Sequence, residues 1–326
     1  MYRKEQIKRI LFSRKVNAMD EKLFQIKYIP KKNAFRKIVT YREDNNIRVM
    51  HEKITSFIVK NTLPSKFSKA YIKNRSIVTN AKAHMYNDIF LMMDIQRFFS
   101  NINHNKLINV LYYELNKKEN IISKVDCTKI VDYCSVGNKG LPIGFVTSPV
   151  LSNLYLKEFD NILYGKLKKY NLENVIYTRY ADDLTISFKK NSSYANDIIV
   201  NIQNTIANLL KRYSLKINER KTKIIDLNKS NHVRITGINI IKDDNNFRRL
   251  SVGKKRKNEL YWSAINYFLT DKDNRNDAEL DKIKGMQSFI LSVEKTGYEN
   301  SFSKAMKSKI NELGYNSLKE LIDKLE

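Results

Sequence analysis

The chain has 326 residues, of which 42% are hydrophobic and 11% aromatic, which excludes a disordered chain and allows a sizeable folded core. Its 60 Lys and Arg residues against 34 Asp and Glu residues give a net charge of +26, which is typical of a protein that binds a polyanion, although a host with generally Lys-rich proteins would explain part of the surplus. The two cysteines, Cys127 and Cys134, lack metal-site spacing and no apolar run approaches about 20 residues, so we expect no zinc site, no disulfide, no membrane partner and a cytoplasmic location.

The first elements are a basic N-terminal segment and a mixed strand and helix region. Residues 1–35 are basic with helical apolar spacing near the start, and we expect a helical extension there. Residues 36–43 then alternate as a strand does, and residues 49–63 have the spacing of a helix. The unbroken apolar run Ile89–Met93 ends at Asp94, which is typical of a buried strand that carries a carboxylate at its C-terminal end.

Two long helices are expected in the middle of the chain. The first covers residues 147–170, with Ser148 as the N-cap and Pro149 at the first helical position. The second is amphipathic and covers residues 192–215.

The last part of the chain changes from strands to helices. Residues 215–227 and 232–241 are strand-like, and from about Leu250 onward the chain is helical and strongly basic. We place a boundary near residues 244–248 and predict an α+β fold with a helical C-terminal part. The expected division is a basic extension, a mixed core and a basic helical region, over residues 1–35, 36–245 and 246–326.

The stretch Tyr177–Ser187 places two adjacent carboxylates, Asp182 and Asp183, between two strand-like runs. Neighbouring side chains of a flat strand face opposite sides, so both can meet a third group only at the tip of a tight hairpin. Together with Asp94 they would form an oxygen-rich cluster that suits two divalent ions, the arrangement that promotes phosphoryl transfer. An isolated pair is usually a solvated turn, as we expect for Asp243–Asp244.

These residues resemble reverse transcriptases, whose palm carries the motif Tyr-x-Asp-Asp, here Tyr180 to Asp183. The resemblance runs in order from about residue 36 to about residue 310 and implies a right-hand polymerase fold with fingers, palm and a helical thumb. It also implies that Asp94, Asp182 and Asp183 bind two Mg²⁺ ions, with Mn²⁺ as a possible substitute. Lys221 matches the lysine that helps pyrophosphate to leave.

Other motifs resemble the nucleotide site of the family. The stretch from residue 140 to residue 153 is similar to the motif beside the incoming nucleotide, although Ile143 replaces the usual glutamine and leaves only backbone contacts at Gly144. Phe99 matches the position that screens out a ribose 2′-hydroxyl. The candidates for binding the triphosphate in the fingers are basic: Arg36, Lys37 and Arg75.

Within the family, the chain most resembles bacterial retron reverse transcriptases. The segment Asn80–His84 matches their Asn-Ala-x-x-His signature, and Ile235–Gly237 is close to their Val-Thr-Gly signature. The resemblance implies that Asn80 and His84 contact RNA, although His84 taken by itself favours a core histidine. It also implies that Thr236 and Gly237 belong to the primer grip, although they could equally form an ordinary hairpin. The thumb residues expected to contact backbone phosphates are Lys254, Lys255, Arg256 and Lys257.

A retron reverse transcriptase implies a structured noncoding RNA as template and primer, deoxynucleotides as substrates and a branched RNA–DNA product. It also implies a separate effector protein and a role in phage defence. Two alternatives remain open. One is another defence reverse transcriptase, primed by a protein or templated unconventionally, and the other is a catalytically weak RNA-binding scaffold, which Ile143 favours and the three aspartates oppose.

Overall fold

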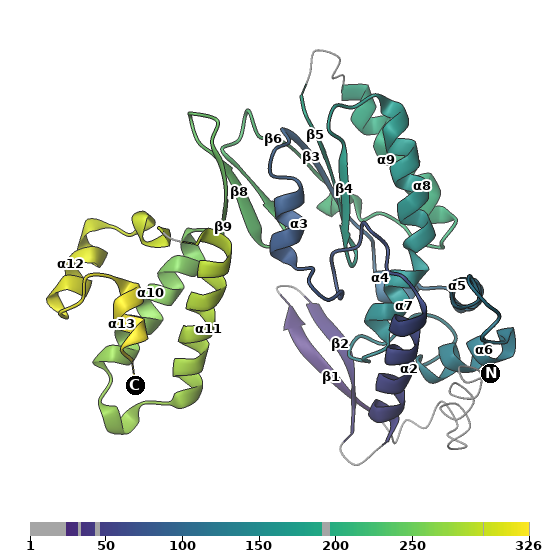
Figure 1. Ribbon diagram of the computed structural model, residues 1–326, viewed down its shortest axis with the longest axis horizontal. Coiled ribbons are helices and arrows are strands. Elements are labelled where there is room, and N and C mark those ends of the chain that lie inside the picture. Colours follow the sequence, from purple (N-terminus) through teal and green to yellow (C-terminus); the bar gives the residue numbers. More distant parts are fainter. Residues whose placement is uncertain (1–23, 32–33, 43–45, 191–195, 296, 326) are drawn as a thin grey trace. The chain divides into compact units, whose positions relative to one another are not determined.

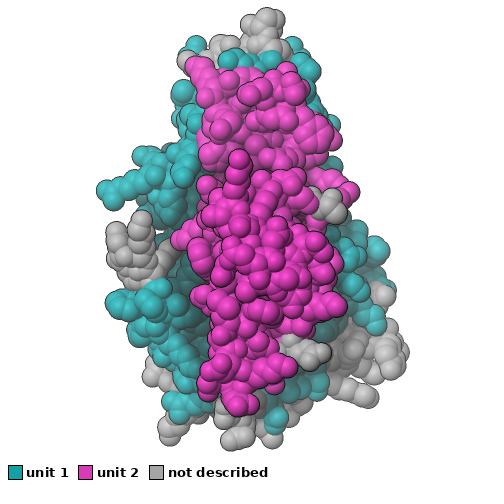
Figure 2. Space-filling model, turned by 90° about the vertical axis from the view of Figure 1, so that its left-hand side faces the viewer, with its two compact units in different colours: residues 1–76, 87–224 teal, residues 77–86, 225–326 magenta. Residues whose placement is uncertain are grey.

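The computed structural model describes residues 24–31, 34–42, 46–190, 196–295 and 297–325. The chain divides into two compact units, coloured separately in Figure 2: unit 1 contains residues 1–76 and 87–224, and unit 2 contains residues 77–86 and 225–326. Within the described ranges, no helix combines the length and the apolar character needed to cross a membrane.

Unit 1 is built around a four-stranded sheet with the strand order β4-β5-β3-β6 (Figure 1). Strand β5 pairs antiparallel with both β3 and β4, and the register places Asp94 opposite Asp183. The predicted strand that ends at Asp94 is confirmed, and it is buried almost throughout, as its unbroken apolar run indicated. The strands are β3 Ile89–Asp94, β4 Ile176–Tyr180, β5 Asp183–Phe188 and β6 Lys223–Asp226.

Helices pack against this sheet and share one apolar core with it. They are α2 Ile47–Asn61, α4 Phe98–Asn101, α5 His104–Leu115, α6 Lys124–Tyr133, α7 Ser148–Tyr155, α8 Lys157–Leu167 and α9 Asn196–Lys211. The helices predicted over residues 49–63 and 192–215 are confirmed as α2 and α9, although their ends differ by a few residues from the predicted ones.

The single helix expected over residues 147–170 is wrong in two respects. It is divided at Leu156, where the backbone leaves helical geometry, so that α7 packs against α5 while α8 packs against α9. The N-cap is Thr147, and Ser148 is the first helical residue. The Ser148 hydroxyl donates instead to the carbonyl of Pro142, at 2.6 Å, and is therefore not used as a cap.

A two-stranded antiparallel hairpin, β1 Phe24–Lys31 and β2 Ala34–Tyr41, precedes the core of unit 1. The helical extension predicted over residues 1–35 is therefore wrong for residues 24–31 and 34–35, while residues 1–23 and 32–33 lie outside the described part. Apolar side chains at Phe24 and Ile26 alternate with polar ones and lie opposite Tyr41 and Val39, so cross-strand pairing decides the local structure.

The hairpin is attached to the core through a buried aromatic cluster. The rings of Tyr41 and Phe145 are stacked with centroids 5.2 Å apart. His51 donates from Nε2 to the carbonyl of Tyr133 and accepts from the Tyr41 hydroxyl at Nδ1, both at 2.8 Å. Burial lowers the pKa of His51 to about 4, so the ring is neutral at physiological pH. The Tyr41 oxygen also accepts the backbone N–H of Val146 at 3.1 Å, which fixes β2 to the loop before α7.

Unit 2 combines a three-stranded antiparallel sheet with helices. Its elements are α3 Ile77–Ala83, β7 His232–Ile235, β8 Ile238–Lys242, β9 Arg248–Ser251, α10 Lys254–Leu269, α11 Asp277–Glu294, α12 Lys304–Glu312 and α13 Leu318–Asp323. The boundary expected near residues 244–248 falls between two paired strands of this sheet, because β9 pairs with β8. The exposed turn predicted at Asp243–Asp244 is confirmed.

Candidate active site

The hairpin between β4 and β5 turns through two residues, Ala181 and Asp182, because Tyr180 pairs directly with Asp183. Ala181 has φ 56, the left-handed conformation that tight hairpin turns require at their first central residue. The N–H of Ile95, the residue after β3, donates to the carbonyl of Asp182 at 2.9 Å. The end of β3 and this turn therefore lie side by side, as the sequence predicted.

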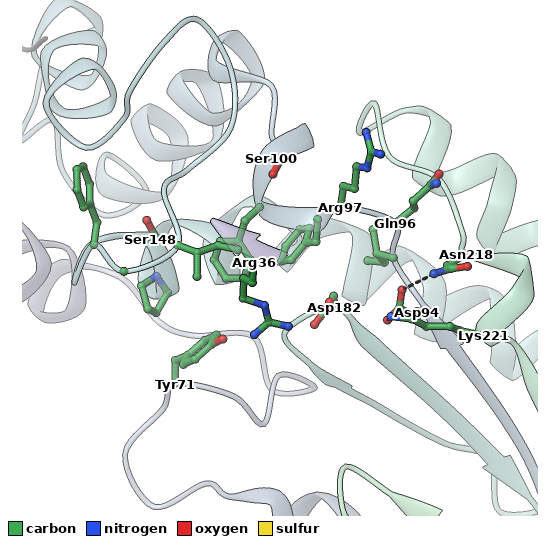
Figure 3. A pocket seen from close by; sticks show the side chains of 17 residues that line it. Arg36, Tyr71, Asp94, Gln96, Arg97, Ser100, Ser148, Asp182, Asn218 and Lys221 are labelled. Carbon is green, nitrogen blue, oxygen red and sulfur yellow. Dashed lines mark hydrogen bonds and ion pairs between the residues drawn. The ribbon is translucent and has the colours of Figure 1, made fainter. Parts of the chain in front are cut away.

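A cavity of about 750 Å³ opens next to this turn within unit 1 (Figure 3). Arg36 enters it from β2, and Asp94 and Asp182 lie on its opposite side with Lys221 beyond them. Six residues predicted from the sequence line it: Arg36, Asp94, Phe99, Gly144, Asp182 and Lys221. The cavity therefore combines cationic, carboxylate and aromatic groups from segments far apart in the chain.

The Asp94 carboxylate is held by two partners from the segment after α9. Lys221 Nζ donates to Oδ1 at 2.5 Å, and Asn218 Nδ2 donates to Oδ2 at 3.2 Å. The backbone N–H of Asn218 also donates to the carbonyl of Asp94, at 2.7 Å. The hydrogen bond to Asp94 raises the pKa of Lys221, so its ammonium group is fully protonated at neutral pH.

The three carboxylates repel one another in this arrangement. Burial raises the pKa of Asp182, and the charge of Asp94 adds to this effect. Loss of solvent, followed by the charges of Asp182 and Asp94, raises the pKa of Asp183 to about 6. A cation bound between them would relieve this repulsion.

The loop before α7 forms another wall of the cavity and comes very close to β2. The N–H of Val39 donates to the carbonyl of Ile143 at 2.8 Å. Gly144 has φ +118, and a Cβ there would lie 2.3 Å from the Val39 carbonyl oxygen, so only glycine fits. The loop therefore lies directly against β2 through its backbone, while the contact of Gly144 with a nucleotide stays a prediction.

Residues 29–240 match the family described as reverse transcriptase (RNA-dependent DNA polymerase). The chain belongs to the reverse transcriptase family. It is 27% identical over 272 residues to the retron Ec86 reverse transcriptase of Escherichia coli, covering 83% of this chain and 77% of that protein. The retron Ec83 reverse transcriptase of Escherichia coli is 22% identical, with 83% of each chain covered. The predictions of a retron-type reverse transcriptase and of an RNA-directed DNA polymerase are confirmed.

Among solved structures, apo telomerase from Candida tropicalis matches this reverse transcriptase with a TM-score of 0.51 and 14% identity. The match covers 95% of this chain and 65% of the telomerase chain, so the chain spans less than two thirds of that protein. This likeness concerns the fold alone. It confirms the predicted α+β, right-hand polymerase architecture.

Reverse transcriptases generally use divalent metal ions, and the acidic residues of this one offer suitable ligands. Among the described residues, no three acidic, His or Cys side chains are gathered into a ready metal site. The Asp94 carboxylate is directed to Lys221 and Asn218 instead. The strand register nevertheless places the three aspartates at one end of the sheet, and their hard oxygen donors fit a divalent ion. Such an ion would replace Lys221 as the positive partner of Asp94.

Replacing Asp183 by Asn is expected to stabilise the metal-free protein at neutral pH. The raised pKa of about 6, against about 3.9 in an unfolded chain, means that ionisation of Asp183 opposes folding. Wild type carries the full penalty above about pH 6 and none below about pH 4, so the gain in Tm should shrink as the pH falls through this window. Thermal unfolding in EDTA across this range checks it. A variant that is less stable than wild type at every pH would contradict the repulsion between these carboxylates.

Arg36 and Lys37 follow one another on β2 and therefore face opposite sides of the hairpin. Both side chains are exposed, but only that of Arg36 lines the cavity. A neighbouring strand residue cannot share the face of Arg36, so the geometry supports Arg36 over Lys37 as a nucleotide ligand, and the role of Lys37 stays a prediction. Arg75 does not line this cavity, and its Nη1 donates to the carbonyls of Ser65 and Ser68 at 2.7 and 2.6 Å, which holds its own loop; its contact with a triphosphate stays a prediction.

Replacing Arg36 by Ala is expected to raise the KM for deoxynucleotides on the order of tenfold, the effect of losing a hydrogen bond to a charged group. The matched change of Lys37 to Ala, on the outer side of the same strand, should leave KM within about twofold of wild type. Steady-state kinetics on a fixed template and primer measure both. Equal increases in KM for the two variants would mean that the face of β2 on which a basic side chain lies does not affect nucleotide binding.

Two predicted RNA contacts in unit 2 are buried. Asn80 of α3 is 1% exposed and His84 is fully buried, so neither offers a surface to RNA, contrary to the prediction. The reason is that α3 packs on β7 and β8, where Asn80 Nδ2 donates to Thr236 Oγ1 at 3.2 Å. Thr236 and Gly237, the predicted primer-grip residues, form the two-residue turn between these strands, with φ 45 and φ 91.

The four basic residues at the start of α10 do not share one environment. Lys254 and Lys255 are exposed, and the Arg256 guanidinium lies 5.0 Å from the ring centroid of Phe289. Lys257 is 6% exposed and forms an ion pair of 2.7 Å with Glu294, so the prediction that it contacts phosphate is wrong. Successive helical residues point about 100° apart, and four in a row cannot all face one ligand.

Several residues of the cavity were not predicted from the sequence. Tyr71, Gln96, Arg97 and Asn218 all line it. Asn218 lies three residues before Lys221, a spacing that was available as a signal, whereas nothing in the sequence around Tyr71 pointed to the cavity. The buried Arg179, within the strand before the turn, was also overlooked, although a charged residue inside an apolar strand is itself a signal.

Proposed function

We propose that this reverse transcriptase copies a structured noncoding RNA into single-stranded DNA by two-metal nucleotidyl transfer. The observation that supports this most directly is that Arg36, Phe99, Asp182 and the Asp94–Lys221 pair face one cavity. These groups provide, in the same space, metal ligands, a cation for phosphate and an aromatic ring at the sugar. No single one of them would distinguish a polymerase from another phosphate-binding protein.

In this proposal each group has a separate task. Asp94 and Asp182 hold the metal ions, and Asp183 assists. Two Mg²⁺ ions, or Mn²⁺ in their place, would lower the pKa of the primer hydroxyl and neutralise the triphosphate. Arg36 binds the triphosphate, and Lys221, protonated at neutral pH, stabilises the departing pyrophosphate.

The proposed template and primer is a structured RNA, with deoxynucleotides as the other substrates. The net charge of +26 and the exposed Lys254 and Lys255 suit backbone phosphates, which add affinity but read no sequence. The similarity to retron reverse transcriptases supports a branched RNA–DNA product and a role in phage defence with a separate effector protein. The buried free thiols of Cys127 and Cys134 suit the cytoplasm.

Sequencing the nucleic acid that copurifies with the protein tests this proposal. A branched RNA–DNA is the expected result. DNA joined to a Tyr or Ser side chain would instead support a protein-primed defence reverse transcriptase, the second candidate, which Ile143 at the usual glutamine position favours. Bound RNA without any DNA would overturn both proposals in favour of an RNA-binding scaffold.

A further inference from the structure

A buried ion pair lies directly behind the turn that carries Asp182. Arg179 of β4 and Asp160 of α8 are both fully buried, and Arg179 donates from Nε and Nη2 to the two carboxylate oxygens, at 2.8 Å each. The Tyr177 hydroxyl donates to the same carboxylate at 2.7 Å. Apolar side chains of similar volume would commonly stabilise a core as well as or better than such a pair. Packing alone therefore does not account for a charged pair at this place.

The remaining nitrogen of Arg179 reaches the turn itself. Nη1 lies 3.3 Å from the carbonyl oxygen of Ala181, which belongs to the peptide that joins Ala181 to Asp182. Ala181 is in the left-handed conformation, which costs a residue other than glycine about 1–2 kcal/mol. The guanidinium is held rigidly by Asp160 and so fixes the orientation of this peptide. The direction of the Asp182 side chain follows from it.

The same network reaches the facing wall of the cavity through Asn153 of α7. Its Oδ1 accepts from Arg179 Nη1 at 3.2 Å and from Ser68 Oγ at 2.8 Å. Its Nδ2 donates to the carbonyl of Ala70 at 2.9 Å. The next residue, Tyr71, has φ 59 and its side chain lines the cavity (Figure 3). Two further backbone hydrogen bonds, of 2.7 and 2.9 Å, join Arg179 to this loop.

We propose that Arg179 is a positioning residue of the active site, which with Asp160 and Asn153 fixes Asp182 on one wall of the cavity and Tyr71 on the other. The role of Asp182 as a metal ligand rests on the proposed function. A single rigid cation would thus set the distance between the proposed metal ligand and a side chain that lines the same cavity. Groups that orient metal ligands commonly change metal affinity or activity 10- to 100-fold when they are replaced.

The test uses one variant of the junction and one matched control. Arg179→Lys keeps a charge beside Asp160 but lacks the planar fork that reaches the Ala181 carbonyl. Glu114→Gln alters a partly buried ion pair, with Lys157, on helices α5 and α8 and outside the lining of the cavity. For each protein we would measure the affinity for Mn²⁺ by electron paramagnetic resonance without nucleotide, the kcat and KM for deoxynucleotides, and amide hydrogen exchange in the metal-free state.

Arg179→Lys should weaken Mn²⁺ binding and lower kcat by about 10- to 100-fold. It should also accelerate exchange over residues 178–184 and 66–72. Glu114→Gln should lower Tm but leave Mn²⁺ affinity and exchange at both segments unchanged. Asn153→Ala leaves the ion pair intact and provides the same comparison if Arg179→Lys does not fold.

Arg179→Lys with wild-type Mn²⁺ affinity and wild-type exchange at both segments would overturn the positioning role, even if its Tm fell. The control separates a local effect from a loss of overall stability. Equal losses of Mn²⁺ affinity and of exchange protection in Glu114→Gln would also overturn the positioning role of Arg179. If the wild-type protein makes no DNA, the proposed function fails, while hydrogen exchange in the metal-free state still decides whether Arg179 fixes the two walls.

Discussion

Replacing Asp182 by Asn is expected to reduce DNA synthesis on an RNA template about a thousandfold or more, with little change in RNA affinity. The amide has nearly the same shape as the carboxylate but lacks the negative charge that a divalent ion requires. The turn that carries residue 182 is fixed by its backbone, through the Ile95 N–H and the left-handed Ala181, so the fold should survive the change. Single-turnover extension and filter binding of the RNA measure the two properties separately.

The matched control is Asp244→Asn, because Asp244 belongs to the exposed Asp-Asp pair between β8 and β9 and is not among the residues that line the cavity. It should synthesise DNA at the wild-type rate. Equal DNA synthesis by wild type and Asp182→Asn would disprove the catalytic assignment. The scaffold reading would then be the better account of the protein.

Replacing Phe99 by Ala is expected to increase ribonucleotide incorporation relative to deoxynucleotide incorporation, on the order of tenfold to hundredfold. The partly buried ring of Phe99 lines the cavity, where removal of its volume would make room for a 2′-hydroxyl. The ratio of kcat/KM for the two sugars on one template measures this selectivity. An unchanged ratio would remove Phe99 from sugar selection.

Phe98 provides a matched control within the same segment. Its ring centroid lies 5.3 Å from that of Phe99, but Phe98 is only 2% exposed and belongs to the core. Phe98→Ala should therefore lower the free energy of unfolding by about 3–5 kcal/mol without changing sugar selectivity. A change of selectivity in this variant alone would mean that the backbone of α4, and not the ring of Phe99, excludes the hydroxyl.

The interactions that hold the site together join residues far apart in the chain. Asp94 is bound by Asn218 and Lys221, which lie more than a hundred residues further on, and Arg179 is bound by Asp160 on a separate helix. Of these partners, only Lys221 was assigned from the sequence, through family resemblance, while Asn218, Asp160 and Arg179 were not. Pairing of this kind depends on which elements pack together, and periodicity within one segment carries no information about it.

The sequence by itself determined the local features of this reverse transcriptase. Strand β3 ending at Asp94 and the tight turn at Asp182 were predictable because burial on both faces and two-residue turns leave their pattern within a few neighbouring residues. Only the tertiary structure decided which of many similar basic residues face the cavity. Arg36 and Lys37 are chemically alike in the sequence, but only Arg36 lines the cavity. Lys255 and Lys257 are also alike, but Lys255 is exposed to solvent whereas Lys257 is buried in an ion pair with Glu294. The physical reason is that the direction of a side chain is set by the register of its strand or helix and by the packing of distant partners, which remove it from water or leave it there.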